Sequence, residues 1–146
     1  MLVVYNMFNI FFLSSLIAIV NSETISYRAN ILPLSNTSTT PAYGFVTIFT
    51  DTSTSVIGYA GIVKKVEPNL LAATCNATNG CGVHIHSGRS CYNSTLQGGH
   101  YFSDLPLDPW IDERYSSDAT GKANFQSIIK IGNVDIEGRA FVGTYE

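Results

Sequence analysis

Basic residues are scarce in this chain. It has eight lysines and arginines among 146 residues, and they are scattered along the sequence instead of forming a patch. A nucleic-acid-binding surface needs clustered positive charge, so this class of partner is excluded. Residues 1–22 carry no charged side chain, so the whole net charge of −3 belongs to the part of the chain that follows.

Long hydrophobic runs are absent after residue 22, and the only one lies before it, at Met7–Val20. An apolar run followed by small residues at Val20 and Ser22 is typical of a signal peptide cleaved before Glu23. The segment lacks the usual Lys or Arg, and an uncleaved membrane anchor is the competing interpretation, because the run approaches spanning length. Residues 23–146 have the size of one ordinary domain.

Three glycosylation sequons of the form N-x-[ST] follow the apolar segment, at Asn36, Asn76 and Asn93. Each is a weak motif by itself, but together with a signal peptide they indicate a secreted glycoprotein. We therefore expect an extracellular or cell-surface protein, in contact with a membrane only if the N-terminal segment is retained.

Cysteines are few and odd in number: Cys75, Cys81 and Cys91. In an oxidising compartment, an odd count implies one thiol left over or a partner outside the chain. A disulfide between Cys75 and Cys81 would close a short loop, and one between Cys81 and Cys91 would bracket the histidines. The sequence leaves both pairings open, and no CxxC redox or metal motif is present.

Amphipathic helices are also lacking, since the hydrophobic period after residue 22 is two instead of 3.6. β-Branched and aromatic residues alternate with polar ones, with turn signals between the runs. The expected strands are residues 24–32, 43–50, 55–66, 82–86, 122–131 and 137–145, with a hairpin turn at 51–54 and a second turn at 117–121. Short strands separated by such turn signals predict an all-β fold, either an antiparallel sandwich or a barrel. Two long connections, 67–80 and 87–117, are expected to be functional or pinned by a disulfide.

Histidine is rare, and all three histidines lie in residues 84–100. His84 and His86 project from the same face of a strand. His100 follows Gly98 and Gly99, which permit backbone conformations forbidden to other residues. Three imidazoles suit copper, zinc, nickel or iron, with copper bound most tightly, and the absence of a carboxylate from the HxH stretch argues against magnesium or calcium. The alternative is a pair of surface histidines without a metal.

The histidine segment resembles the copper-binding segment of the copper/zinc superoxide dismutase family. The similar motifs are GVHIHSG, GGHYF, SDATGKANF and EGRAFV. The sequence CGVHIHSGRSC, together with the later DPW, is most similar to the secreted copper-only branch of the family. The resemblance covers nearly all of residues 23–146. It implies a Greek-key β-sandwich or flattened barrel with long metal-site loops. It also implies an extracellular antioxidant enzyme, a copper-dependent superoxide dismutase that converts superoxide to oxygen and hydrogen peroxide.

The resemblance also implies roles for individual residues. His84 and His86 would be the strand ligands of copper, and His100 the loop ligand. No further histidine remains for a zinc site, so copper alone is expected. A carboxylate can replace zinc in holding the loop histidine, and Asp108 is the candidate. The competing interpretation of Asp108 is a turn-forming residue before proline.

Other positions match the family only in part. Gly138 and Arg139 match its G-R pair, in which the arginine is structural. Cys91 lies near the position of the family's half-cystine in the metal loop, and this chain has no cysteine at the position of that residue's usual partner. Thr144 stands where the family has its fourth copper-ligating histidine, and the family's substrate-guiding arginine is also absent. This divergence is expected to weaken Cu(II) relative to Cu(I) and to impair turnover, and it suggested a truncated or divergent C-terminus.

Two other functions fit the same residues. Three histidines with an open position also describe a catalytic zinc that ionises water. A glycosylated copper-binding or structural module could have kept the fold and lost the activity. The sequence does not indicate an oligomeric state.

Overall fold

The computed structural model describes residues 2–4, 8–9, 24–34 and 41–144. Most of the predicted signal peptide, its cleavage site before Glu23 and the sequon at Asn36 lie outside these residues, so these predictions are untested. No helix in the described part of the chain is long and apolar enough to span a membrane.

The fold is all-β, as the period of two predicts. Its strands are β1 (Leu2–Val4), β2 (Phe8–Asn9), β3 (Thr24–Pro33), β4 (Tyr43–Asp51), β5 (Val56–Lys64), β6 (Val83–Ile85), β7 (Ala123–Lys130) and β8 (Phe141–Gly143). The two helical elements are short: a 3₁₀ turn, η1 (Ala72–Thr74), and one turn of α-helix, α1 (Ser94–Gln97). All six strands expected from the sequence are present, although β8 is shorter than predicted. β1 and β2 were not predicted as strands, and α1 was not predicted as a helix.

Antiparallel pairing connects the strands in the order β6-β8-β1-β3-β4-β5-β7, and β2 pairs separately with β3. The predicted hairpin is present between β4 and β5. Its turn begins at Asp51, whose carboxylate accepts a hydrogen bond from the backbone N–H of Ser53 at 2.9 Å. The β4–β5 register pairs Asp51 with Val56, so the polar residues between them form the turn.

In the longer strands, one face is more buried than the other. In β3 the side chains of Tyr27, Ala29 and Ile31 are buried, while the residues between them are exposed. In β4, Val46 and Ile48 are both fully buried at 0% exposure. The apolar residues that alternate along the sequence are therefore those of the core.

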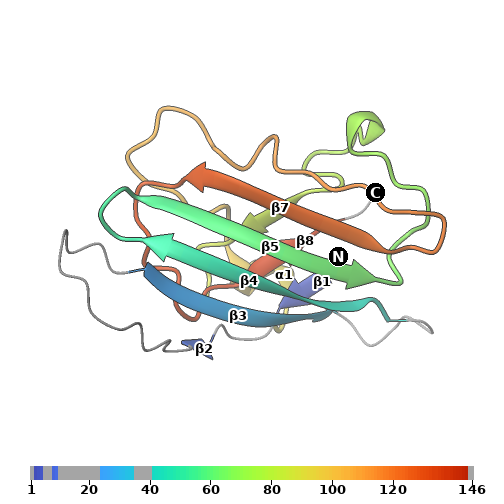
Figure 1. Cartoon of the computed structure of the whole chain (residues 1–146), viewed down its shortest axis with the longest axis horizontal. Coiled ribbons are helices and arrows are strands. Elements are labelled where there is room, and N and C mark those ends of the chain that lie inside the picture. The colour runs from blue at the N-terminus through green and yellow to red at the C-terminus, as the bar shows by residue number, and fades with distance from the viewer. Residues whose placement is uncertain (1, 5–7, 10–23, 35–40, 145–146) are drawn as a thin grey trace.

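The sheet curves over itself into two layers (Figure 1). Phe141 on β8 stacks on Phe125 of β7, with ring centroids 6.0 Å apart, although β8 and β7 are far apart in the order of pairing. Phe141 also meets Tyr59 of β5 edge to face, again at 6.0 Å. Trp110, from the long loop after β6, is fully buried and lies beside the Tyr59 ring. This aromatic cluster joins the β6–β8 pair and the long loop to the larger part of the sheet.

A disulfide closes the first long connection. It joins Cys75 to Cys81, with their Cα atoms 6.0 Å apart, which is the first of the two pairings left open by the sequence. Cys91 is outside the disulfide and partly buried. The Arg114 guanidinium donates a hydrogen bond to the Cys75 carbonyl at 2.8 Å, so the second long loop fastens the disulfide-closed one.

Replacing Phe141 by alanine should lower the free energy of unfolding by about 3–5 kcal/mol, because a ring buried between the two layers leaves a cavity when it is removed. Tyr92→Ala is the control, since this aromatic side chain is 88% exposed. Its effect should stay within about 0.5 kcal/mol. Denaturant unfolding measures both, and equal effects from the two variants would contradict the packing described.

Candidate metal centre

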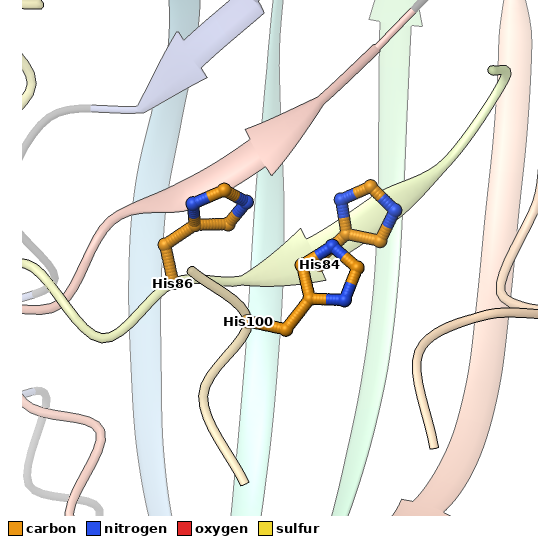
Figure 2. Close-up of side chains that lie close together, drawn as sticks. All are labelled: His84, His86 and His100. Atoms are coloured by element: carbon orange, nitrogen blue, oxygen red, sulfur yellow. The ribbon is translucent and has the colours of Figure 1, made fainter. Parts of the chain in front are cut away.

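The three histidines of the chain come together in space. One ring nitrogen from each of His84, His86 and His100 lies within 4.8 Å of the others (Figure 2). The rings of His84 and His100 stack with centroids 4.3 Å apart, and those of His86 and His100 meet edge to face at 5.4 Å. Strand β6 and the loop after α1 therefore converge on one small volume.

Strand β6 supplies His84, and His86 follows directly after it. The two project from the same face because side chains alternate along extended backbone. The other face carries Val83 and Ile85, which are 2% and 0% exposed and belong to the core. His84 is also buried, at 1% exposure. β6 therefore has buried side chains on both faces, one apolar and the other imidazole.

The loop histidine is held against β6 by backbone hydrogen bonds. His100 and His86 form an isolated antiparallel bridge. The N–H of Tyr101 donates to the Ile85 carbonyl at 2.7 Å, and the N–H of Ser87 donates to the Gly99 carbonyl at 2.8 Å. The loop thus pairs with the chain at the end of β6 like a short additional strand, which fixes the His100 backbone beside its partners.

Hydrogen bonds occupy one nitrogen on two of the rings. His86 Nδ1 lies 2.8 Å from the Gly98 carbonyl oxygen, so it must carry the proton and leaves Nε2 as a lone-pair donor. His100 Nδ1 lies 2.6 Å from Asp108 Oδ2, which likewise leaves Nε2. His84 Nδ1 and His100 Nε2 are buried and have no hydrogen-bond partner among the described residues.

These orphaned nitrogens fit a metal ion. A buried polar atom without a partner costs about 1–3 kcal/mol, and coordination to a cation is a direct way to satisfy a lone pair. The donor set would be Nδ1 of His84 with Nε2 of His86 and His100. An all-imidazole set is compatible with copper, zinc, nickel or iron, so the cluster could hold a metal ion but does not by itself identify the element.

The environment keeps two of the imidazoles neutral. Burial, reinforced by repulsion from His100 and His86, lowers the pKa of His84 to about 3. Burial is also the main reason that the pKa of His86 lies below its usual value. Metal ions bind the neutral form of imidazole, so the protein avoids most of the cost of removing a proton when a cation binds.

Asp108 uses both carboxylate oxygens. Oδ2 lies 2.6 Å from His100 Nδ1, and Oδ1 accepts a hydrogen bond from the Trp110 backbone N–H at 2.9 Å. The Trp110 indole in turn donates to the Tyr101 carbonyl at 2.9 Å. Asp108 therefore makes both contacts considered from the sequence. It accepts a hydrogen bond within the turn that contains Pro109, and it is hydrogen-bonded to His100.

Thr144 lies beside the histidine strand but is bonded to the backbone. Its hydroxyl accepts a hydrogen bond from the Gly82 N–H at 3.0 Å and donates to the Asn79 carbonyl, and its own N–H donates to the Gly82 carbonyl at 2.9 Å. Thr144 thus fastens the end of β8 to the loop before β6 and offers no nitrogen to the histidine cluster.

The remaining predicted residues lie around the cluster or away from it. Gly138 has a φ of +71°, which favours glycine at the turn before β8. Arg139 contacts residues adjacent to two of the histidines, as described below. Asn76 and Asn93 are both exposed, and the Asn93 side chain caps α1 by accepting a hydrogen bond from Leu96 N–H at 2.9 Å. Cys91 is not part of the histidine cluster.

Gly82 is a site residue that the sequence did not single out. A Cβ at this position would lie 2.2 Å from His84 Nε2, closer than two such atoms can approach. The His84 ring therefore occupies the space that a larger residue would fill. The only signal in the sequence was a glycine directly before the HxH strand, which is compatible with many other roles.

Comparison with known proteins adds no relative: no family model, no curated protein and no solved structure matches this chain. The fold and the histidine cluster therefore rest on the chain's own residues.

The change Gly82→Ala should push the His84 ring aside and lower metal affinity by about tenfold or more, in the range found when supports of a metal ligand are removed. The matched control is Gly58→Ala on β5, where the nearest atom to an added Cβ is at 3.8 Å, an ordinary contact. Isothermal titration calorimetry with Cu(II) measures the metal affinity of both variants. Unchanged affinity in the Gly82 variant would contradict this packing constraint.

Proposed function

We propose that this chain is a copper-dependent superoxide dismutase of the copper-only type. The observation that carries the proposal is that one ring nitrogen from each of the three imidazoles lies within 4.8 Å of the others, while two of the rings have a buried nitrogen without a hydrogen-bond partner in the described residues. The resemblance of the surrounding motifs to the copper/zinc superoxide dismutase family gives the element and the reaction. The metal would be copper, and the substrate superoxide.

The fold proposed is the Greek-key sandwich or flattened barrel of that family. It is supported by the all-antiparallel pairing, by the curvature that brings Phe141 against Phe125, and by the two long loops on either side of β6. Zinc is not proposed, because all three histidines are already used in one cluster and Asp108 occupies Nδ1 of His100.

The chain's residues have distinct parts in this chemistry. Copper held by these histidines would supply one-electron redox chemistry: the oxidation of one superoxide to oxygen and, with two protons from water, the reduction of a second to hydrogen peroxide. His84 and His86 hold one side of the site from a rigid strand. The Asp108 carboxylate holds the proton of His100 on Nδ1, so that the Nε2 lone pair remains turned toward the other two imidazoles. His84 is buried, while His86 and His100 are partly exposed.

A secreted location accompanies the proposal. The disulfide between Cys75 and Cys81 is of a kind that forms and persists in oxidising compartments. The sequons at Asn76 and Asn93 are both at exposed positions, as glycosylation requires. Secretion, glycosylation and removal of the N-terminal segment are all part of the proposal, and this removal would take β1 and β2 out of the sheet.

A non-catalytic copper-binding glycoprotein is the second candidate. The observation that favours it is Thr144, whose hydroxyl is engaged with the backbone of Gly82 and Asn79 and contributes no fourth nitrogen. Three imidazoles without a fourth suit Cu(I) better than Cu(II), which prefers a tetragonal set of ligands. Copper held too firmly as Cu(I) would be bound without rapid turnover.

Loading the protein with Cu(II) and recording its electron paramagnetic resonance beside a superoxide-consumption assay separates the candidates. Nitrogen hyperfine structure with turnover supports the dismutase. The same spectrum without turnover supports the binding protein. Preferential zinc binding with hydrolytic activity, or no tight metal binding at all, would overturn both. His86→Gln is the reference variant, because it removes one donor and should weaken binding.

The change Asp108→Asn should lower copper affinity by about ten- to a hundredfold, because an amide holds the Nδ1 proton of His100 less strongly than a carboxylate does. Asp104→Asn is the matched control, an exposed aspartate in the same loop. Competition titration against a copper chelator gives both affinities. Equal affinities in the two variants would show that Asp108 acts only as a turn cap.

A further inference from the structure

The guanidinium group of Arg139 lies between the two segments that carry the histidines. Its Nη1 donates a hydrogen bond to the Ser87 carbonyl at 2.5 Å, and Ser87 directly follows His86. Its Cζ lies 3.6 Å from the centroid of the Tyr101 ring, and Tyr101 directly follows His100. One side chain thus contacts the immediate neighbour of a strand histidine and the immediate neighbour of the loop histidine.

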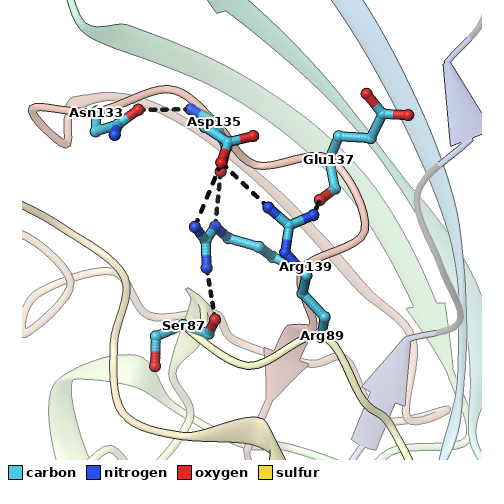
Figure 3. A network of polar contacts seen from close by, with 6 residues as sticks. All are labelled: Ser87, Arg89, Asn133, Asp135, Glu137 and Arg139. Atoms are coloured by element: carbon cyan, nitrogen blue, oxygen red, sulfur yellow. Dashed lines mark hydrogen bonds and ion pairs between the residues drawn. The ribbon is translucent and has the colours of Figure 1, made fainter.

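The loop before β8 fixes this guanidinium from the opposite side. The Nε of Arg139 donates to the Asp135 carbonyl at 2.6 Å, and its Nη2 lies 3.6 Å from Asp135 Oδ2 (Figure 3). Arg89 reaches the same carboxylate oxygen at 3.1 Å and donates to the Glu137 carbonyl. Asp135 is held in place by its backbone N–H, which donates to Asn133 Oδ1 at 2.9 Å.

Burial distinguishes the two arginines. The side chain of Arg139 is 14% exposed, whereas those of Arg89 and Asp135 are 52% and 58% exposed. The Arg89–Asp135 pair is therefore largely screened by water and contributes little by itself. The Arg139 side chain is mostly buried, and it is held by hydrogen bonds to two backbone carbonyls as well as by its stacking on Tyr101.

Backbone hydrogen bonds connect the same segments, but each one spans only two of them. The His86 N–H donates to the Ala140 carbonyl at 2.8 Å, which joins the end of β6 to the chain before β8. The Ser87 N–H donates to Gly99, which joins it to the loop. Arg139 is the point at which all three segments meet: the end of β6, the loop of His100 and the turn before β8.

We propose that Arg139 is a positioning residue for the histidine site, which sets the separation between the strand ligands and the loop ligand. This inference rests on the proposed metal-binding function. Arginine suits the task because its planar fork donates in several directions while its face stacks on an aromatic ring. Lysine has a single ammonium group and cannot make the directed hydrogen bonds and the stack together.

The test compares Arg139→Met with Arg28→Met. Arg28 provides a matched control, because its guanidinium also stacks on an aromatic ring, 4.1 Å from the Phe45 centroid, on the exposed face of the sheet and outside the site. Copper(II) affinity and electron paramagnetic resonance are measured for each full-length variant. Thermal unfolding without metal is measured beside them. Arg139→Met should lower copper affinity by about ten- to a hundredfold, as loss of a ligand support does, and should alter the nitrogen hyperfine pattern. Arg28→Met should leave both unchanged.

Two further variants keep the inference falsifiable if Arg139→Met fails to fold. Arg139→Lys should give an intermediate loss of affinity, and Tyr101→Leu should also weaken binding because it removes the stacking partner. Wild-type affinity and spectrum in Arg139→Met, or in both of the other variants, would overturn the positioning role. Failure of the wild-type protein and of Arg28→Met to bind copper would instead overturn the proposed function.

Discussion

The pairing of β6 with β8 is the constraint on which the rest of the site depends. It spans three residue pairs, Val83 to Ile85 against Phe141 to Gly143, yet β6 carries His84 and leads directly into His86, and β8 carries the buried ring of Phe141. Because side chains alternate, fixing this register sends His84 to one face and Val83 and Ile85 to the other. A shift by one residue would exchange histidines for core residues, so the core and the cluster specify the same register.

The cluster has an energetic cost that the surrounding fold must offset. His84 is buried and neutral, with one nitrogen unpartnered in the described residues, and its ring fills space left open by Gly82. The aromatic contacts of Phe141 with Tyr59 and Phe125 stabilise the packing of β8 against β5 and β7. A bound cation would recover part of the cost, which is why metal binding and folding stability should be linked in this protein.

Support for the histidines comes from different parts of the chain. Asp108 holds the ring of His100, the Gly98 carbonyl holds the ring of His86, and Arg139 reaches the residues that follow both. Asp108 and Arg139 were each noted in the sequence, the first as a carboxylate that could hold a histidine and the second as a structural arginine. Their distances to the cluster were not accessible from sequence, because these contacts join residues of separate loops.

The sequence by itself determined the strands, the turns and the identity of the three histidines, because these depend on local alternation and on residue chemistry. The alternation in β3 corresponds to burial from Tyr27 to Ile31, and the HxH spacing put two imidazoles on one face. Only the tertiary structure decided the pairing of Cys75 with Cys81, the burial of His84, the closure of the cluster by His100 and the commitment of Thr144 to the backbone. The presence of β1, β2 and α1 was likewise not predicted from the sequence. Each depends on which distant segments meet, and long-range packing of a curved sheet, unlike strand periodicity, leaves no repeating signal in the chain.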